Sequence, residues 1–405
     1  MKNLYGRKEK PLWAHERAET QAAQGQRINL GELLFFASFF AFFLKYTMDI
    51  SGIITRDETL NSALVGFSII CSVTKILTQR YTPLRFALTM SACAVIGYSS
   101  LISINYLFLL GFLLIMGMQD IDFLKIIKIV FWGKTINMSA HVLCYIYVYN
   151  TNPSAITFSF RAGTGLPRHF FFMGHANTFS AFLVWTCIEY IFINYSRLRA
   201  RHLAAIWLIN IFFYMFTDSN SGITVLSIVT ALIALDKSSK GFFDKPLAFF
   251  AKYAYTFLAV FFPFTAAVYT MLDGRLKELW HILDGFLTGR MWYGAYAYYR
   301  HGPTLGGRPD MAPENIFWSG RWFDTMTIFD NYYLGNFLSY GYIHLIITAL
   351  AFIILCGKME NREKIIIIAF ILYGIMESYV TNISICFALI IIGKYLYQRK
   401  DKSSG

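Results

Sequence analysis

The sequence predicts an all-α integral membrane protein with about twelve transmembrane helices and a helical cap on its extracytoplasmic side. Only 15% of its 405 residues are charged, while 56% are hydrophobic and 18% aromatic; a soluble protein carries roughly 25% charged residues. The hydrophobic residues occur in runs of about 15 to 25, long enough to cross ~30 Å of hydrocarbon. Only a helix satisfies its own backbone within such a run. The alternating segments of about 10 residues that are typical of a membrane barrel are absent.

Twelve apolar segments are expected to span the membrane. They lie at about 31–49, 60–78, 84–100, 102–118, 124–149, 171–194, 203–217, 221–236, 248–272, 332–357, 364–380 and 382–398. The division between the third and fourth depends on a weakly polar stretch from Tyr98 to Asn105. Because twelve is an even number, both termini are expected on the same side of the membrane.

The distribution of cations predicts which side that is. Lysines and arginines concentrate in the N-terminal tail and in alternate connections, and the connections between them carry almost none. By the positive-inside rule, both termini are expected in the cytoplasm. The net charge of +12 therefore marks cytoplasmic flanks and is poor evidence for a nucleic-acid partner. The expected organisation is a tail at 1–29, helices at 30–272 with an outer loop at 150–170, a cap at 273–331, helices at 332–398 and a tail at 399–405.

No cofactor or metal is expected from the sequence. All six cysteines fall inside proposed spans and none belongs to a CxxC pair, so they read as buried apolar thiols. The connections contain no metal-ligand cluster, P-loop or dinucleotide-binding glycine signature. Two charges lie deep in proposed spans, Lys134 and Glu189, and their opposite signs predict an ion pair inside the bundle.

Two outer connections differ from the rest. The first, at 150–170, holds Arg161, Arg168 and His169 without any acidic residue. The second, at 273–331, is by far the longest polar stretch, and it is rich in aromatic residues. Long loops of this kind are usually functional or disordered, and the aromatic content favours a folded unit.

The longer connection contains a predicted amphipathic helix. Its apolar residues follow helical spacing at Leu276, Leu279, Trp280, Leu283 and Leu287. Such a helix lies in the membrane interface with its charged residues toward water, here Arg275, Lys277, Glu278 and Asp284. The cap has five arginines and one lysine among its cations. Arginine suits a bidentate grip on phosphate or carboxylate, although pairing with the acids of the cap explains each arginine equally well.

Four segments together resemble one family. The strings are RHFFFMGHANTFSAFLVW at 168–185, FTDSNSGITVLSIV at 216–229, LTGRMWYGAYAYYRHGPTLGGR at 287–308 and DNYYLGNFLSYGYI at 330–343. In this order they resemble the conserved segments of Wzy-type polysaccharide polymerases, which share a superfamily with the O-antigen ligases. Two departures stand out. Ser219-Asn220 replaces a serine-arginine pair, and Asp330 replaces the histidine found in the ligases, which favours a polymerase.

The resemblance implies a GT-C-like helical bundle and an extracytoplasmic reaction. Oligosaccharide repeat units carried on undecaprenyl diphosphate would be joined by transfer of the growing glycan to the non-reducing end of the incoming unit. It implies no metal, because arginines bind the diphosphate and a base activates the acceptor. It also implies that a polysaccharide chain-length regulator is a candidate partner. The lipid bilayer is expected to surround the helices.

The resemblance assigns roles to several residues. Arg168 and Arg290 align with the diphosphate-binding arginines. Arg161 shares the loop with Arg168, so either could be the ligand, and Arg300 is a further candidate in the cap. Fixed cations stabilise the charge that develops on a leaving diphosphate.

The base remains open between several groups. Asp330 stands at the outer start of a span, where an N-cap role with Asn331 is an equal alternative. Glu377, at the outer end of the eleventh span, is a rival, and Asp218 is a third carboxylate. His175 is expected mainly to cap or orient the sixth helix through Asn177, with a direct catalytic role as the alternative.

Two other functions fit the sequence. One is a ligase that transfers finished glycan to an acceptor, which Asp330 disfavours. The other is not an enzyme but a flippase or transporter of the lipid-linked oligosaccharide. Transporters usually show two repeated halves, with broken helices near the midplane. Here the polar residues gather in one cap late in the chain, which favours a surface active site.

Overall fold

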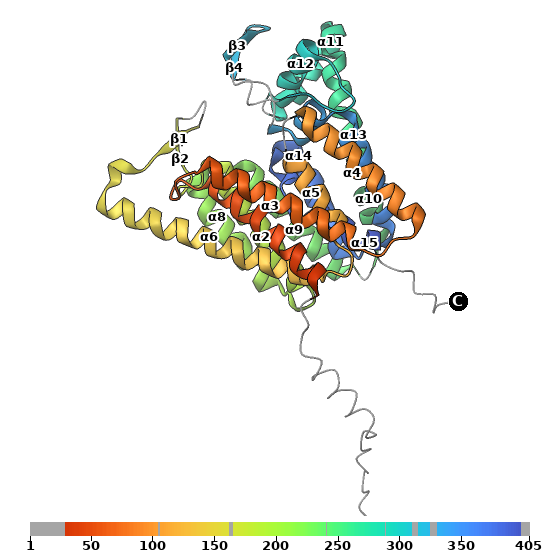
Figure 1. Cartoon of the computed structure of the whole chain (residues 1–405). Coiled ribbons are helices and arrows are strands. Elements are labelled where there is room, and N and C mark those ends of the chain that lie inside the picture. The colour runs from red at the N-terminus through yellow and green to blue at the C-terminus, as the bar shows by residue number, and fades with distance from the viewer. Residues whose placement is uncertain are drawn as a thin grey trace, which may run out of the picture.

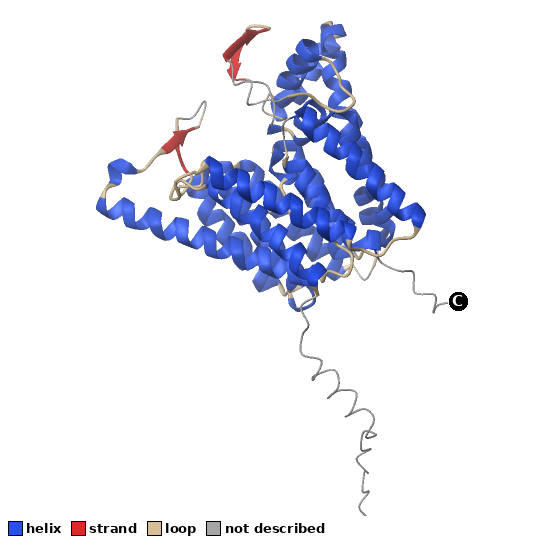
Figure 2. Ribbon diagram, in the orientation of Figure 1, coloured by secondary structure: helices blue, strands red, loops and turns tan. Residues whose placement is uncertain are grey.

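The computed structural model describes residues 29–103, 106–161, 165–239, 241–287, 289–309, 315–324 and 330–397. The terminal tails expected at 1–29 and 399–405 lie outside these residues, apart from Asn29. Within the described part, helices make up almost all of the regular structure, and the only strands form two short hairpins (Figure 2). The prediction of an all-α membrane protein is confirmed at this level.

Among the described residues, eight helices are long and apolar enough to cross a membrane. They are α2 (Leu30–Ile50), α3 (Glu58–Leu77), α4 (Pro83–Ser103), α7 (Ala176–Ile193), α8 (Ala200–Thr217), α9 (Asn220–Ser238), α10 (Asp244–Val268) and α13 (Tyr332–Leu355). Several expose large apolar side chains on their outer faces, as helices in contact with lipid do, because lipid is as apolar as a protein core.

The other four predicted segments also contain helices, but these fall short of a full apolar span. They are α5 (Leu107–Met116), α6 (Phe123–Thr151), α14 (Asn361–Met376) and α15 (Ile390–Tyr397). Helix α6 is long but carries three lysines, whereas the other three are short. The boundary between the third and fourth segments lies later than predicted, because α4 continues to Ser103. The number of twelve spans therefore stays a prediction.

Helix α13 is broken at Gly341, where a single straight helix was expected. Gly341 has φ 73° and ψ −166°, and a Cβ there would lie 2.4 Å from the carbonyl oxygen of Leu305. The segment around Leu305 fills the break, since Tyr342 N–H donates to Thr304 and Ile343 N–H to Leu305, both at 3.2 Å. Backbone that leaves a helix inside a membrane protein must find such partners.

The break brings together two residues that a straight helix would separate. Tyr332 and His344 are twelve residues apart, about 18 Å along an ideal helix. In the structure, the Tyr332 hydroxyl and His344 Nε2 share a hydrogen bond of 3.0 Å. The first two turns of α13 are therefore folded back toward the rest of the helix.

The predicted cap contains α11 (Gly274–Phe286), α12 (Arg290–His301) and a hairpin of β3 (Asn315–Trp318) and β4 (Arg321–Asp324). A second hairpin pairs β1 (Phe158–Phe160) with β2 (Pro167–His169), with Ser159 opposite Arg168. Figure 1 places both hairpins, α11 and α12 at the same end of the molecule, opposite the first residues of α2. Helix α12 contacts α10 and α13, so this unit packs directly on the bundle.

The amphipathic helix is present as α11, but the prediction that Asp284 faces water is wrong. Only Trp280 of the predicted stripe is buried, whereas Leu276 and Leu279 are exposed. Asp284, expected toward water, is buried because its Oδ1 accepts hydrogen bonds from the N–H groups of Met291 and Trp292, at 2.9 and 3.1 Å. A carboxylate that satisfies free N–H groups in the first turn of α12 is stabilised by them.

The predicted pair of Lys134 and Glu189 is confirmed. Both side chains are fully buried, and Lys134 Nζ lies 2.5 Å from Glu189 Oε1. The same ammonium donates to the carbonyl oxygen of Ile385 at 2.7 Å. Ile385 belongs to the stretch between α14 and α15. The buried cation therefore links α6, α7 and this stretch.

Candidate functional site

Several helix ends meet beneath the end of the molecule that carries α11, α12 and the two hairpins. His175 stands at the N-cap of α7, Ser219 at the N-cap of α9 and Asn331 at the N-cap of α13, and Glu377 directly follows α14. Arg290 is the first residue of α12. We use "outer cluster" for the side chains that these ends bring together: Arg168, Asn177, Ser221, Arg290, Asp330 and Glu377.

Glu377 lies at the centre of the outer cluster. The residue is 2% exposed, and its Oε1 accepts hydrogen bonds of 2.9 Å from both Ser221 Oγ and Asn177 Nδ2. Arg290 approaches the same oxygen at 3.9 Å. Burial and, after it, the charge of Asp330 raise the pKa of Glu377 to about 8, against the opposing effect of Arg290. A carboxyl held in this way is poised to change protonation state near neutral pH.

Arg168 reaches the cluster from β2. Its Nε donates to the carbonyl oxygen of Thr217 at 2.9 Å, and its terminal nitrogen donates to Asn177 Oδ1 at 2.5 Å. Asn177 thus accepts from Arg168 on one side and donates to Glu377 on the other. The strand is held in place by His169, whose Nδ1 shares a 2.7 Å hydrogen bond with the Tyr145 hydroxyl.

Arg290 stands between two carboxylates. One of its terminal nitrogens is 3.9 Å from Glu377 Oε1 and 3.9 Å from Asp330 Oδ2. The side chain of Asp330 is 49% exposed, against 3% for Glu377, so Asp330 is the carboxylate that faces outward. Loss of hydration raises the pKa of Asp330, and the charge of Arg290 opposes the change.

The capping role proposed for Asp330 belongs to its neighbour. Asn331 Oδ1 accepts from Leu334 N–H at 2.9 Å, and Asn331 Nδ2 donates to the Ile375 carbonyl at 2.8 Å. The second bond ties the start of α13 to the end of α14, which fixes Asp330 close to Glu377. His175 does act as the N-cap of α7, since its Nδ1 accepts from Asn177 N–H at 3.2 Å. Loss of hydration and the charge of Arg168 lower the pKa of His175.

Arg161 and Asp218 form a separate pair. Arg161 lies 2.9 Å from the carboxylate of Asp218 and also donates to its backbone carbonyl. Asp218 has φ 47° and ends α8, so this arginine satisfies the free carbonyl end of a helix. In the described contacts, both residues stand apart from Glu377 and Arg290.

Arg300 is not brought to the cluster. It is exposed in the last turn of α12, ten residues from Arg290 and therefore about 15 Å along the helix axis. The roles given to Arg161, Arg300 and Asp218 from the sequence thus find no counterpart in the geometry of the cluster.

The sequence did not predict that Asn177 and Ser221, two members of the outer cluster, contact Glu377. Asn177 was considered only as a partner of His175, and Ser221 was not considered. Both lie in the first turn of an apolar helix, at the outer end. This position is the one sequence feature that could have indicated their role, because a polar side chain in the first turn of a helix lies next to free N–H groups and to other helix ends.

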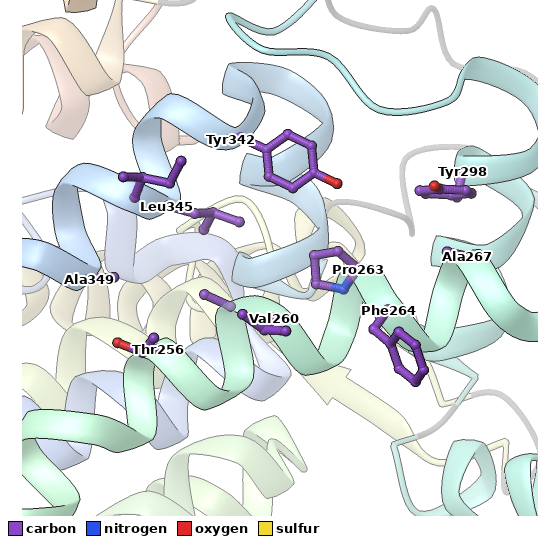
Figure 3. A pocket seen from close by; sticks show the side chains of 11 residues that line it. Thr256, Val260, Pro263, Phe264, Ala267, Tyr298, Tyr342, Leu345 and Ala349 are labelled. Atoms are coloured by element: carbon purple, nitrogen blue, oxygen red, sulfur yellow. The ribbon is translucent and has the colours of Figure 1, made fainter.

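An apolar hollow of about 340 Å³ lies between α10 and α13. Figure 3 shows Pro263 of α10 in its wall, with Tyr298 of α12 and Tyr342 of α13 toward one end. Tyr298 is eight residues from Arg290, about 12 Å along α12. Val260 and Phe264, which also line the hollow, are more than half exposed, so it opens on the outer surface of the bundle.

Among the described residues, no three or more histidine, cysteine, aspartate or glutamate side chains are grouped to hold a metal ion. The cluster offers two guanidinium groups near a buried carboxyl, one linked to it through Asn177 and one 3.9 Å from it, and a second carboxylate exposed beside Arg290. Such an arrangement can bind a dianion and accept a proton nearby. Comparisons of this chain with family models, with curated proteins and with solved structures found no match.

Proposed function

We propose that this protein is a polysaccharide polymerase of the bacterial cytoplasmic membrane. It would join oligosaccharide repeat units carried on undecaprenyl diphosphate, at the outer face of the membrane. In this proposal twelve helices form a GT-C-like bundle with both termini in the cytoplasm, and α11, α12 and the β3–β4 hairpin form an extracytoplasmic cap over the outer cluster. The observation that carries the proposal is that Arg168, through Asn177, and Arg290 are both linked to the same carboxyl oxygen of Glu377.

The two arginines suit the leaving group. A lipid diphosphate leaves readily when fixed cations meet the charge that develops on it. Arg290 is 14% exposed and is the first residue of α12. Asp284 already accepts from the N–H groups of Met291 and Trp292, so the guanidinium itself would meet the anion. Glu377 is linked to both arginines, to Arg168 through Asn177, and would fix their spacing, which makes it a positioning residue.

Asp330 suits the role of base better than Glu377. The base must touch the acceptor hydroxyl, and the side chain of Asp330 is half exposed whereas that of Glu377 is enclosed. In the proposed step, the acceptor oxygen attacks the anomeric carbon of the growing glycan, and the bond from that carbon to the diphosphate oxygen breaks. Asp330 takes the hydroxyl proton, and undecaprenyl diphosphate leaves with the bonding electrons.

The apolar hollow suits the hydrocarbon of such a lipid. It begins near Tyr298 on the helix that carries Arg290, and it opens toward the bilayer. A chain whose diphosphate is bound at Arg290 could lie along this surface between α10 and α13. Alanine, proline and aromatic residues line the hollow, so a hydrocarbon chain can contact them without removing water from a polar group.

A deletion strain tests the proposal. Loss of a polymerase should leave single repeat units displayed on the outer surface, and the wild-type gene should restore polymer. Arg290→Ala, Arg168→Ala and Asp330→Asn should each fail to restore polymer at normal protein level. Lys128→Gln, which removes an exposed charge at the other end of the molecule, should restore it.

Two results would overturn the proposal. Repeat units confined to the cytoplasmic side would identify a flippase. Long polymer retained on the lipid carrier would identify a ligase. Analysis of the lipid-linked glycans by mass spectrometry separates these outcomes.

A further inference from the structure

A basic hollow lies at the end of the molecule opposite the outer cluster. It has a volume of about 710 Å³ and forms where α7 passes into α8. Its lining consists of Tyr190, Asn194, Ser196, Arg197, Leu198, Arg199, Arg201 and His202. Helix α7 begins and α8 ends at the outer cluster, so the connection between them lies at the other membrane surface.

The chain around the hollow is well held. Leu198 is buried, and Arg197 N–H donates to the Asn194 carbonyl at 2.8 Å. His202 Nδ1 accepts from Arg199 N–H at 3.0 Å, which closes the start of α8. The backbone that carries the three arginines therefore has a definite shape, and only their long side chains need to settle on a ligand.

The arginines of the hollow differ from other cations at this end. Lys125 pairs with Glu32, Arg362 pairs with Glu360 at 2.7 Å and Lys394 pairs with Glu363 at 2.6 Å. By contrast, no described carboxylate lies within ion-pair distance of Arg197, Arg199 or Arg201, and none lines the hollow. The positive-inside rule accounts for cations here, but it does not account for three of them around one concave surface without an acid.

The surface next to the hollow is apolar and suits contact with hydrocarbon chains. Immediately after Arg201, α8 exposes a series of large apolar side chains. Trp207 is 41% exposed, Leu208 62%, Phe212 56% and Met215 76%. They continue along α8 away from the arginines to the last turn of the helix. A ligand with an anionic head and hydrocarbon chains matches both parts, whereas a soluble anion uses only the first.

We propose that this hollow binds the headgroup of an anionic phospholipid, whose acyl chains lie along the exposed face of α8. Arginine fits this role because its planar fork holds two phosphate oxygens at once. The site is distinct from the outer cluster, and the proposal does not depend on the reaction proposed there. The bound lipid would brace the junction of α7 and α8 at the membrane surface.

Native mass spectrometry of the purified full-length protein tests this site. The protein is presented with phosphatidylglycerol and phosphatidylcholine of the same chain length at equal concentration. Wild type should retain phosphatidylglycerol preferentially. The triple variant R197Q/R199Q/R201Q should lose this preference, by about fivefold for each arginine. The triple variant R80Q/K128Q/K245Q removes the same charge from exposed positions outside the hollow and should keep the preference.

Three results would overturn the proposal. The first is equal retention of the two lipids by wild type, which is decisive even if the arginine variant does not fold. The second is an equal loss of preference in both triple variants, which would show a general charge effect. The third is displacement of bound phosphatidylglycerol by inorganic phosphate, which would identify a site for a soluble anion. R197K/R199K/R201K keeps the charges and should bind more weakly than wild type.

Discussion

Asn177 Nδ2 donates a 2.9 Å hydrogen bond to Glu377 Oε1, although 200 residues separate them in the chain. The same amide accepts from Arg168 through its oxygen. An asparagine is suited to this position because its side chain offers both a donor and an acceptor. Asn177 therefore sets the distance between a cation on β2 and a carboxyl at the end of α14.

Replacing Asn177 should separate these two groups. We expect Asn177→Ala to lower polymer formation about 10- to 100-fold, because one hydrogen bond to a charged group is lost on each side of the amide. Polymer length and amount on gels, at matched protein level, measure this effect. Asn220→Ala changes an exposed asparagine in the first turn of α9 and should have little effect. Normal polymer in Asn177→Ala would mean that the bridge is not needed.

Arg161 and Arg168 should behave differently, although they share one loop. Arg161 is engaged by Asp218, and we expect Arg161→Ala to keep most of the activity and to lose about 1 kcal/mol of stability or less. Arg168→Ala should abolish polymer, because it removes a cation from the outer cluster. Complementation of the deletion strain compares them directly. Equal losses in both variants would indicate that the whole hairpin matters and not one guanidinium.

The stability of the protein should depend on pH through Glu377. A carboxyl whose pKa is raised on folding, here from 4.5 to about 8, holds its proton more tightly in the folded state. Its contribution to stability is therefore present at low pH and is lost as pH rises from about 4.5 to about 8. We expect the melting temperature of the wild type in detergent to fall over this range more than that of Glu377→Gln. Parallel curves for the two proteins would contradict the assignment, and Glu58→Gln, at an exposed position, serves as the control.

Gly341 should not tolerate a side chain. Its positive φ and the close Leu305 carbonyl leave no room for a Cβ, so Gly341→Ala should cost about 2 kcal/mol or more in stability. Thermal unfolding in detergent measures the change. Gly357→Ala is a matched control, because a Cβ there would meet nothing within 4 Å. A variant at Gly341 as stable as the control would mean that the break in α13 is not a fixed feature.

Sequence patterns predicted the helices well because each apolar run must bury its backbone polar groups within itself. All twelve predicted segments contain a helix, and the His175 cap and the Lys134–Glu189 pair are confirmed. The break at Gly341 could not be predicted, since the segment that fills it begins near Thr304, more than thirty residues earlier. Periodicity describes one helix at a time and says nothing about such insertions.

Only part of the site could be predicted from the sequence. Arg168, Arg290, Asp330 and Glu377 were candidates, and the structure brings all four into one cluster. Their bridge was not predictable, because Asn177 and Ser221 meet Glu377 only through the packing of α7, α9 and α14. The orientation of α11 was misjudged because Asp284 looked like a surface charge, while its real partners are the N–H groups that begin α12.

The buried ammonium of Lys134 also constrains how the chain is made. Its two partners are synthesised later: Glu189 follows with the next long apolar helix, and Ile385 is 251 residues away. A lone charge in the bilayer is costly. In the proposed twelve-helix topology, α6 therefore enters the membrane with an unpaired charge that α7 neutralises soon after translation. The hydrogen bond to Ile385 forms only when the last part of the chain is made. Insertion of α6 alone, without α7, should therefore stall at the translocon, and the order of the helices in the gene is part of what makes the bundle assemble.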